Sequence, residues 1–559
     1  MRHLVLLAGL LALTQSSFAQ WSSDPAVNLV VANAAGDQVQ PKVLPTPDGG
    51  VYISWFDGAG FDVRIQRLFE GGTEVFPHDG ILVADRGFSS TQDYGLAMDN
   101  ASNALLAFRD DRISGTQITA AIVTPTGTQP WGATGVQLTS TSDFLAAPII
   151  TGTTDGGSVV SWTQEETVRV QKLDAAGNAQ WPMDVVLTPT VGTYSASDLH
   201  ADGTDAILSF VHVTGNPTAP KHLIAQKLDI DGNLLWGTNH VAVFDGGSLQ
   251  FGNFPDFVPD GSGGGVFSWY DTAGATLECY VQRILSNGTE AFTHNGLVVS
   301  TNGAQGRVGP DVAFDAATSE IYVFWTELAN GQSLQGLSGQ KIDAAGIRRW
   351  TDIGLELVAP GAGEIASVRT VVGGPGAFVF WDAAPSFGRD QLFGANASGD
   401  ASGTIETFTF DVSTTPSGKS RLVVANSTGG FAVLAWQDER SGSDDIYAQN
   451  VNPDGTLGIP VGVESEVPSL SLDLRALPNP SNGRIQFEYA VPASGNVELA
   501  IYDVLGRQVW TQHIHTGGGR DHVTWDGRSH QGRSIGAGVY FARLRQSGLE
   551  RSISLVVVR

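Results

Sequence analysis

The sequence of 559 residues contains one cysteine, Cys279, and three methionines. A single thiol excludes an intramolecular disulfide and a cysteine-based zinc site, and Cys279, on one strand face with Val281, is expected to be a buried structural thiol. Charged residues make up only 16% of the chain, and no segment between residues 21 and 460 keeps a helical spacing of apolar residues. These absences exclude a disulfide-rich domain, a helical bundle and a disordered chain.

Basic residues are also scarce, with 31 Lys and Arg against 57 Asp and Glu and a net charge of −26. The balance is uneven: from Arg475 onward there are 10 arginines and 6 acidic residues, so this part is +4 and the remainder −30. A strongly acidic chain repels phosphates, so nucleic acid is not an expected partner. Cationic ligands, metal ions or no charged partner remain open.

Long apolar runs are absent except at the N-terminus. Leu4 to Leu13 is apolar, Arg2 and His3 precede it, and Ser17-Phe-Ala19 offers small residues at a cleavage site. Residues 1–19 therefore resemble a secretory signal peptide. No other run approaches the roughly 18 apolar residues of a membrane span, and no cysteine follows the run as a lipid anchor. We expect a soluble protein, secreted or at the cell surface, without a transmembrane segment.

Two markers repeat along the chain. An aromatic anchor recurs at Trp55, Phe108, Trp162, Phe210, Trp269, Trp325, Trp381 and Trp436. A Gly-x-x-x-aromatic marker recurs at Gly72/Phe76, Gly127/Trp131, Gly177/Trp181, Gly232/Trp236, Gly288/Phe292 and Gly346/Trp350. Each repeat reads as four short strands bounded by Gly, Asp, Asn and Pro. Four strands in about 50 residues are typical of a β-propeller blade.

We therefore predict an all-β fold with an eight-bladed propeller over residues 20–463. Seven blades remain the alternative, because the seventh repeat lacks the second marker and carries an irregular stretch at 396–409. Val27 to Val31 resembles the fourth strand of a repeat and could complete the last blade, which leaves no exposed sheet edge. Gln residues recur in the third strands, and we expect them to satisfy backbone groups between neighbouring blades. They are Gln66, Gln171, Gln226, Gln282, Gln340 and Gln449.

A linker is expected at residues 464–474, followed by a different module at 475–559. Its strands alternate cleanly, as in Ile485, Phe487 and Tyr489, with glycine-rich turns between them. This pattern predicts a small antiparallel β-sandwich of Ig-like type.

The last module contains motifs in a fixed order: Leu477-Pro-Asn-Pro480, Asn482-Gly483, Val497 to Asp503, Leu505-Gly-Arg507, Trp525-Asp-Gly527 and Gly538-Val-Tyr540. In these it resembles the C-terminal sorting domain of type IX secretion cargo. It is equally similar to the Ig-like domain of flagellar hook-capping proteins. The resemblance implies recognition by a secretion machine, followed by cleavage or surface attachment. The propeller repeats resemble those of exported bacterial proteins and imply no activity.

An acidic residue stands two positions after the anchor in five repeats: Asp57, Asp110, Asp271, Glu327 and Asp438. These positions lie where the second strand enters the loop to the third, on the usual ligand face of a propeller. A partial ring of carboxylates could bind a cation or serve acid–base chemistry. Alternatively, each caps its own turn or pairs with a nearby Arg64, Arg112 or Arg440.

The loop Asp438 to Asp445 is dense in acidic residues. Asp438, Asp444 and Asp445 are candidate calcium ligands, although the loop lacks the alternating order of a calcium loop. No other cofactor is expected.

The sequence favours an exported, non-catalytic propeller that binds or adheres to an extracellular glycan or protein, carried by the sorting module. One alternative is a secreted polysaccharide hydrolase or lyase that uses paired carboxylates. The other is a structural spacer. Fold alone cannot choose among them.

Overall fold

The computed structural model describes residues 20–58, 60–87, 94–113, 115–238, 240–384, 386, 388–459, 473–477, 479, 481, 483–491, 495–504, 506–516, 519–546 and 549–558. Over these residues the chain is all-β, with no helix that could cross a bilayer. It divides into two compact units, residues 1–463 and 464–559. The expected signal peptide at 1–19 and most of the expected linker at 464–474 lie outside the described residues.

The described residues of the first unit form eight antiparallel sheets of four strands, in the order of the sequence repeats. Sheet 1 contains β2 (Gln38–Pro45), β3 (Val51–Asp57), β4 (Asp62–Leu68) and β5 (Ile81–Ala84), and sheet 2 contains β6 (Gly95–Met98), β7 (Ala104–Asp110), β8 (Gln117–Val123) and β9 (Val136–Gln137). Sheet 3 contains β10 (Leu145–Gly152), β11 (Ser158–Gln164), β12 (Thr167–Leu173) and β13 (Val185–Leu187), and sheet 4 contains β14 (Thr193–Asp202), β15 (Asp205–Val213), β16 (Lys221–Leu228) and β17 (Val241–Phe244). Sheet 5 contains β18 (Phe257–Pro259), β19 (Gly265–Asp271), β20 (Glu278–Ile284) and β21 (Leu297–Val298), and sheet 6 contains β22 (Gly306–Asp315), β23 (Glu320–Ala329), β24 (Leu334–Ile342) and β25 (Leu355–Gly361). Sheet 7 contains β26 (Glu364–Gly373), β27 (Gly376–Ala384), β28 (Asp390–Gly399) and β29 (Ile405–Ser417), and sheet 8 contains β30 (Lys419–Asn426), β31 (Ala432–Asp438), β32 (Asp445–Val451) and β1 (Leu29–Ala32).

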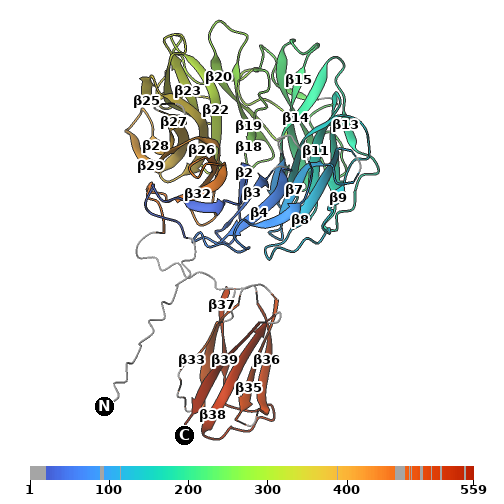
Figure 1. The fold of residues 1–559 in the computed structure, drawn as a ribbon, viewed down its shortest axis with the longest axis vertical. Coiled ribbons are helices and arrows are strands. Elements are labelled where there is room, and N and C mark those ends of the chain that lie inside the picture. Colours follow the sequence, from blue (N-terminus) through green and yellow to red (C-terminus); the bar gives the residue numbers. More distant parts are fainter. Residues whose placement is uncertain are drawn as a thin grey trace, which may run out of the picture. The chain divides into compact units, whose positions relative to one another are not determined.

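The sheets follow one another around a ring, from β2 in blue to β32 in orange (Figure 1). The first strand of each sheet contacts the first strand of the next, and β30 contacts β2. The first strands therefore form the inner wall of a propeller-like ring. The stretch 396–409, which looked irregular in the sequence, consists of the end of β28, the connection at 400–404 and the start of β29, and the two strands pair with each other.

The N-terminus completes the last sheet. β1 pairs antiparallel with β32, with Leu29 opposite Ala448 and Val30 opposite Tyr447. The amide of Asn28 also donates to the carbonyl of Val412 at 2.9 Å. As the sequence predicted, a strand from one terminus is paired with strands from the other, which leaves no open edge at this position.

The core of the ring lies between neighbouring sheets. The anchor aromatics are buried, and Trp55, Phe108 and Trp162 have no solvent exposure. Side chains of adjacent sheets share one cluster, as Val168 and Val170 of β12 do with Leu208 and others of β15. Burying a large aromatic side chain contributes roughly 1.5–3 kcal/mol, so the repeated anchors supply much of the stability.

The glutamine of a third strand hydrogen-bonds to the backbone at the aromatic residue of the Gly-x-x-x-aromatic marker in the same repeat. Oε1 of Gln171 accepts the N–H of Trp181 at 3.2 Å, and its Nε2 donates to the carbonyl of Trp181 at 3.2 Å. The same arrangement joins Gln66 to Phe76 and Pro77, Gln226 to Trp236 and Gly237, Gln282 to Phe292 and Thr293, and Gln340 to Trp350 and Thr351. The prediction that these amides join neighbouring blades is wrong for these five, because their bonds stay within one repeat.

The aromatic held in this way packs on a glycine of the next sheet. A Cβ placed on Gly232 would lie 3.1 Å from the ring of Trp181, and the Trp181 indole donates to the carbonyl of Ile230 at 2.9 Å. The same contact pairs Phe76 with Gly127, Trp131 with Gly177, Trp236 with Gly288, and Phe292 with Gly346. These glycines have φ between +80° and +87°, where only glycine avoids strain. The second sequence marker is therefore the contact between neighbouring sheets.

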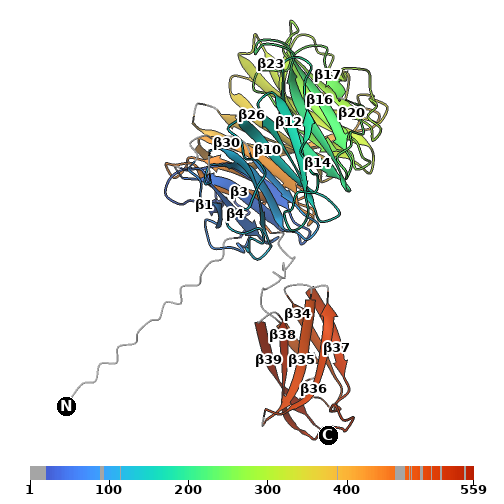
Figure 2. The same cartoon turned by 90° about the vertical axis from the view of Figure 1, so that its right-hand side faces the viewer.

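The second unit consists of two antiparallel sheets around one core. One contains β33 (Asp473–Leu477), β34 (Ile485–Val491) and β37 (Gly519–Trp525), and the other contains β36 (Gln508–Thr516), β35 (Gly495–Asp503), β38 (Gly538–Gln546) and β39 (Leu549–Val557). Figure 2 shows β35, β36, β38 and β39 running side by side. Ile485, Phe487, Leu499, Ile501 and Leu544 are fully buried between the two sheets. The alternating residues Ile485, Phe487 and Tyr489, named from the sequence, lie together in this core.

Replacing Gly232 with alanine tests the contact between sheets, with Gly237→Ala as its matched control. Both glycines have positive φ, +83° and +89°, but a Cβ on Gly237 would meet nothing within 4 Å. The positive φ costs either variant about 1–2 kcal/mol. We expect Gly232→Ala to lose about 1–3 kcal/mol more, because its Cβ crowds Trp181 and Val185. Chemical denaturation measures both values, and equal losses would contradict the contact.

Candidate binding site on the inner strands

The five acidic positions lie at or near the ends of second strands, and each has partners there. Three pair with the arginines named from the sequence. Arg64 Nε lies 2.5 Å from Asp57 Oδ2, Arg112 Nη2 lies 2.7 Å from Asp110 Oδ2, and Arg440 Nη2 lies 2.6 Å from Asp438 Oδ2. The backbone N–H groups of Arg112 and Arg440 also donate to Oδ1 of the aspartate two residues earlier, at 3.1 Å. This is the turn-capping alternative that the sequence left open.

The other two acidic positions are occupied differently. Oδ1 of Asp271 accepts the backbone N–H groups of Ser248 and Ala273, both at 2.9 Å. Oε2 of Glu327 accepts the indole N–H of Trp325 at 2.5 Å, and Arg307 lies 3.6 Å from its Oε1. Burial raises the pKa of Glu327, although Trp325 and Arg307 act against it. The five carboxylates are distributed over five sheets, and as a ligand ring they stay a prediction.

The proposed calcium ligands are also engaged with their own loops. Asp444 accepts from the Gln437 amide at 3.2 Å, and Asp445 accepts from the hydroxyls of Ser441 and Ser443. Within the described ranges, no three His, Cys, Asp or Glu side chains are placed to hold a metal ion. Calcium binding by Asp438, Asp444 and Asp445 stays a prediction, and its measurement is the unfolding midpoint in calcium and in EDTA.

A repeated β-bulge shapes the inner wall. The register shifts in six of the first strands, directly before Lys42, Ile149, Asp198, Asp311, Arg369 and Val423. In five of these bulges a residue has φ between +46° and +57°: Gln40, Ala147, Gly309, Ser367 and Arg421. Bulges redirect side chains and are frequent beside functional sites. In these six strands, the residue directly after the bulge occupies an equivalent position.

Charged residues occupy this position in successive sheets. Asp198, Asp311 and Arg369 pair with Ser209, Phe324 and Phe380, each of which directly precedes an anchor aromatic. In sheet 5, Asp256 directly precedes Phe257, which pairs with Phe267. Sheets 4, 5, 6 and 7 therefore present Asp, Asp, Asp and Arg on the inner wall.

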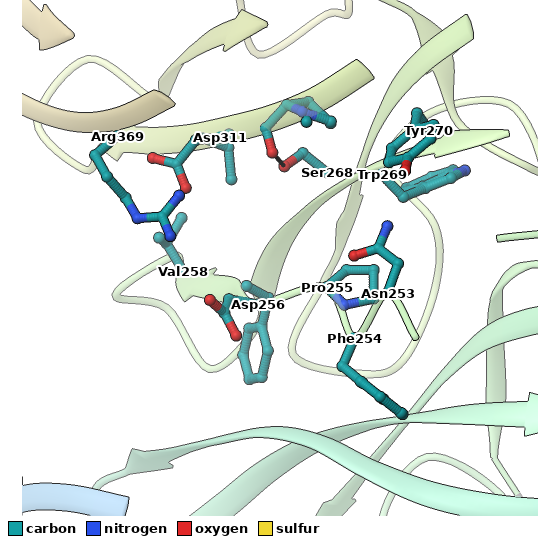
Figure 3. A pocket seen from close by; sticks show the side chains of 14 residues that line it. Asn253, Phe254, Pro255, Asp256, Val258, Ser268, Trp269, Tyr270, Asp311 and Arg369 are labelled. Atoms are coloured by element: carbon teal, nitrogen blue, oxygen red, sulfur yellow. Dashed lines mark hydrogen bonds between the residues drawn. The ribbon is translucent and has the colours of Figure 1, made fainter. Parts of the chain in front are cut away.

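A cavity of about 250 Å³ opens between sheets 5, 6 and 7, and we call it the inner-wall cavity. Its lining includes Asp256, Asp311, Arg369, Ser268 and Tyr270. Figure 3 shows the carboxyl of Asp311 beside the guanidinium of Arg369, with Asp256 pointing into the same space. None of the five acidic positions is among the described residues that line it.

Asp311 and Arg369 have different surroundings within the cavity. Asp311 accepts the backbone N–H of Thr370 at 2.5 Å, and burial raises its pKa to about 6 against the opposing effect of Arg369. Arg369 donates from NH1 to the carbonyl of Val368 at 2.8 Å. In the described part of the chain it has no carboxylate within ion-pair distance. Most of its five N–H donors thus remain available to a ligand.

A second charged pair stands on the neighbouring sheet. Asp198 accepts from His200 Nε2 at 3.0 Å and from the backbone N–H of Phe257 at 3.0 Å. Burial would lower the pKa of His200, but the carboxylates of Asp198 and Asp256 outweigh it and raise the pKa. The bond from Phe257 to Asp198 repeats the bond from Thr370 to Asp311, so both aspartates tie their sheet to the next.

Sequence reasoning missed this site. The repeated markers of the sequence include none of Asp256, Asp311 and Arg369. The repeated Pro-Asp pair before two anchors was the available signal. The bulges directly before Asp311 and Arg369 depend on pairing between strands, which the periodicity alone does not reveal.

The Asp438→Asn variant tests the structural role of an acidic position. Asp438 and Lys419 are fully buried, 3.3 Å apart, and Arg440 completes the cluster. Burial would raise the pKa of Asp438, but hydrogen bonds from Arg440 and the charge of Lys419 lower it. Removing the carboxylate leaves the buried Lys419 and the partly buried Arg440 without this ion-pair partner, so we expect a loss of about 3–5 kcal/mol in unfolding free energy.

The control is Asp352→Asn, whose side chain is 83% exposed; we expect a change within about 0.5 kcal/mol. Because the folded pKa of Asp438 is depressed, its contribution is present above the unfolded pKa of about 4 and is lost as the pH falls through the folded value. The difference between Asp438→Asn and the wild type should therefore shrink in acid. A constant difference would contradict the ion pair.

Several solved structures align with the chain at low similarity. PorZ, a surface component of the type-IX secretion system of Porphyromonas gingivalis, is 12% identical over 95% of this chain and 85% of its own, with a TM-score of 0.28. The polysaccharide lyase Uly1 is 12% identical over 79% and 94%, with a TM-score of 0.37. The GH93 α-L-arabinofuranosidase of Fusarium graminearum is 10% identical over 78% and 99%, with a TM-score of 0.35.

No curated protein matches the sequence. Residues 475–558 match the model of the secretion system C-terminal sorting domain, as the motifs in this part of the sequence predicted. The second unit is thus a sorting domain of type IX secretion, and the chain that carries it is a secreted or cell-surface protein.

Proposed function

We propose that the eight sheets are the blades of one closed propeller over residues 20–463, joined by a linker at 464–474 to an Ig-like sorting domain at 475–559. The N-terminus supports this closure beyond strand β1. Gln449 donates to the carbonyl of Ser22 at 2.8 Å, and Trp21 packs on Gly72 and donates to the carbonyl of Glu70 at 2.8 Å. Trp21 and Ser22 thus supply the aromatic marker that the eighth repeat lacks.

In this proposal residues 1–19 direct export and are removed, so that Trp21 stands close to the mature N-terminus. The sorting domain then brings the propeller to the outside of the cell. The function of the protein follows from what the propeller does there.

The propeller, we propose, is an extracellular binding module that holds a saccharide in the inner-wall cavity. The observation that carries this proposal is Arg369, a half-buried guanidinium that lines the cavity and, among the residues that the structure describes, makes one hydrogen bond, to the carbonyl of Val368. A cavity of about 250 Å³ is smaller than the pockets that enclose drug-sized ligands. It suits one or two sugar rings of a longer chain.

The chemistry of the lining favours a neutral polyhydroxylated ligand. Asp256 and Asp311 accept hydrogen bonds from hydroxyl groups, while Arg369 and Asn253 donate them. A carboxylate ligand would meet two aspartates, and a cationic ligand would meet the arginine. At the rim, Phe254 is 47% exposed and offers an apolar face to a sugar ring.

Hydrolysis of the bound glycan is the second candidate, and Asp311 favours it. A carboxyl whose pKa is about 6 is partly protonated at mildly acidic pH and can serve as a general acid. Asp256, in the same cavity, would be the second carboxylate. This activity predicts a rate that falls as the pH rises through about 6, because the proton donor is lost.

Saccharide retention by the full mature chain tests both candidates. Soluble and insoluble polysaccharides would be incubated with the protein, and bound protein and released oligosaccharide would both be measured. We expect retention without product in the wild type. Arg369→Ala should weaken binding at least about tenfold, because hydrogen bonds to a charged group are worth about 1.5–3 kcal/mol. Arg389→Ala, an exposed arginine outside the cavity lining, is the control and should bind as the wild type does.

Each other outcome has a defined meaning. Released product that disappears in Asp311→Asn would replace the binding proposal with hydrolysis. Retention that survives Arg369→Ala but is lost in Asp57→Asn or Asp271→Asn would move the site to the acidic ring. Neither retention nor product across the panel would overturn saccharide binding and leave a protein partner or a spacer.

A further inference from the structure

The exposed apolar side chains of the sorting domain gather on one face. Among the described residues of this unit, the large hydrophobic residues with substantial exposure are Val504 (66%), Val539 (45%), Phe541 (44%), Val556 (36%) and Val558 (45%). Single exposed apolar residues need no explanation, but a contiguous group on a monomer is often an interaction site.

Strand pairing places these residues together. Val539 of β38 lies opposite Val556 of β39, and Phe541 lies opposite Tyr502 of β35. Side chains two residues apart on a strand share a face. Val504 and Val558 follow Tyr502 and Val556 by two residues, just beyond the strand ends, and so continue the same surface. We call Tyr502, Val504, Val539, Phe541, Val556 and Val558 the apolar face.

The opposite face of the same sheet forms the core of the domain. Ala542 and Leu544 of β38, and Leu555 of β39, alternate with the residues of the apolar face and are fully buried. The apolar face is therefore not a displaced part of the core. It is a second hydrophobic surface on a sheet that already has one.

Side chains of the sorting motifs form hydrogen bonds within the domain. Asn479 of the Pro-Asn-Pro motif donates to the carbonyl of Ser554 at 2.8 Å and accepts the N–H of Val556 at 2.8 Å, so it covers the free edge of β39. The Trp525 indole donates to the carbonyl of Arg528 at 2.8 Å, and the Tyr540 hydroxyl donates to the carbonyl of Gly536 at 3.0 Å. These motif side chains thus stabilise the domain itself, and the apolar face is a separate surface that they leave uncovered.

Charge indicates the chemistry of that partner. From Arg475 onward the chain carries 10 arginines against 6 acidic residues, whereas the rest is strongly acidic. Arg543 lies on the sheet next to the apolar face, with its guanidinium 4.3 Å from the centre of the Tyr502 ring. Interfaces of this kind combine an apolar centre with a charged rim that selects the partner.

We propose that the apolar face is the surface by which this sorting domain docks on the secretion apparatus, at an apolar protein groove bordered by carboxylates. The proposal rests on the export role proposed above, because the occupant is inferred from the match to a sorting domain. It adds the residues that make the contact. Edge pairing to the last residues of β39, from Ser554 onward, is excluded as the docking mode, since Asn479 and Ser481 already occupy that part of the edge.

The test is export of the full chain from a bacterium that has a type IX system. In Phe541→Ser combined with Val539→Thr, we expect the exported fraction to fall at least about tenfold and the chain to accumulate in the periplasm. Both side chains are exposed, so the unfolding midpoint of the purified variant should match that of the wild type within the range for surface substitutions. The matched control is Met183→Ser combined with Val191→Thr, at residues of the first unit that are 82% and 62% exposed, which should be exported normally.

A third variant separates this proposal from the export role itself. Trp525→Asp places a charge in the core of the sorting domain, where Trp525 is 1% exposed, and unfolds the domain within the full chain. If Trp525→Asp is retained but the double variant is exported, the apolar face is not the docking surface. If both are exported, the domain does not direct export at all. If the wild type sediments as a dimer that the double variant dissociates, the face belongs to a second copy, and the proposal is also overturned.

Discussion

The first unit depends on one interaction that is repeated around the ring, in which a glutamine holds an aromatic residue that packs on a glycine of the next sheet. Gln171 fixes both backbone groups of Trp181, whose ring covers Gly232 and whose indole donates to Ile230. A glycine with positive φ is needed there because a Cβ would collide with the ring. Where the aromatic residue is a tryptophan, as at Trp181 and Trp236, one sheet is thereby tied to the next by packing and by hydrogen bonding at the same point.

The same interaction explains why the two ends of the unit meet. The eighth repeat ends without an aromatic marker, and Trp21 with Ser22 takes its place, bonded to Gln449 and packed on Gly72. Strand β1 then completes the last sheet beside β32. A ring held at its outer part by these contacts leaves its inner strands freer to vary, and the bulges with positive φ, together with the charged residues that follow them, lie there.

Much of the architecture could be predicted from the sequence, because it depends on residues that repeat. The anchor aromatics predicted the second strands, and Val27 to Val31 predicted the strand that joins the last sheet. The motifs from Leu477 to Tyr540 predicted the sorting domain. The arginines near Asp57, Asp110 and Asp438 even predicted their ion pairs.

The candidate site could not be predicted in the same way, because it lies where the repeats differ. Asp311 and Arg369 occupy the same position in neighbouring sheets, but one is acidic and the other basic, so no repeated pattern marks them. Their meeting depends on the bulges before them and on the contact of β22 with β26. The hydrogen-bond partners of the glutamines could not be predicted either. Their recurrence is visible in the sequence, but the partner of each amide depends on where the chain turns after the third strand.

The most direct measurement of the central claim is a crystal structure of the mature chain with the saccharide that it retains best. The account predicts electron density for a sugar in the inner-wall cavity, within hydrogen-bonding distance of Arg369 and of Asp256 or Asp311. Density confined to the loops that carry Asp57, Asp271 and Asp438, with the cavity unchanged, would contradict it.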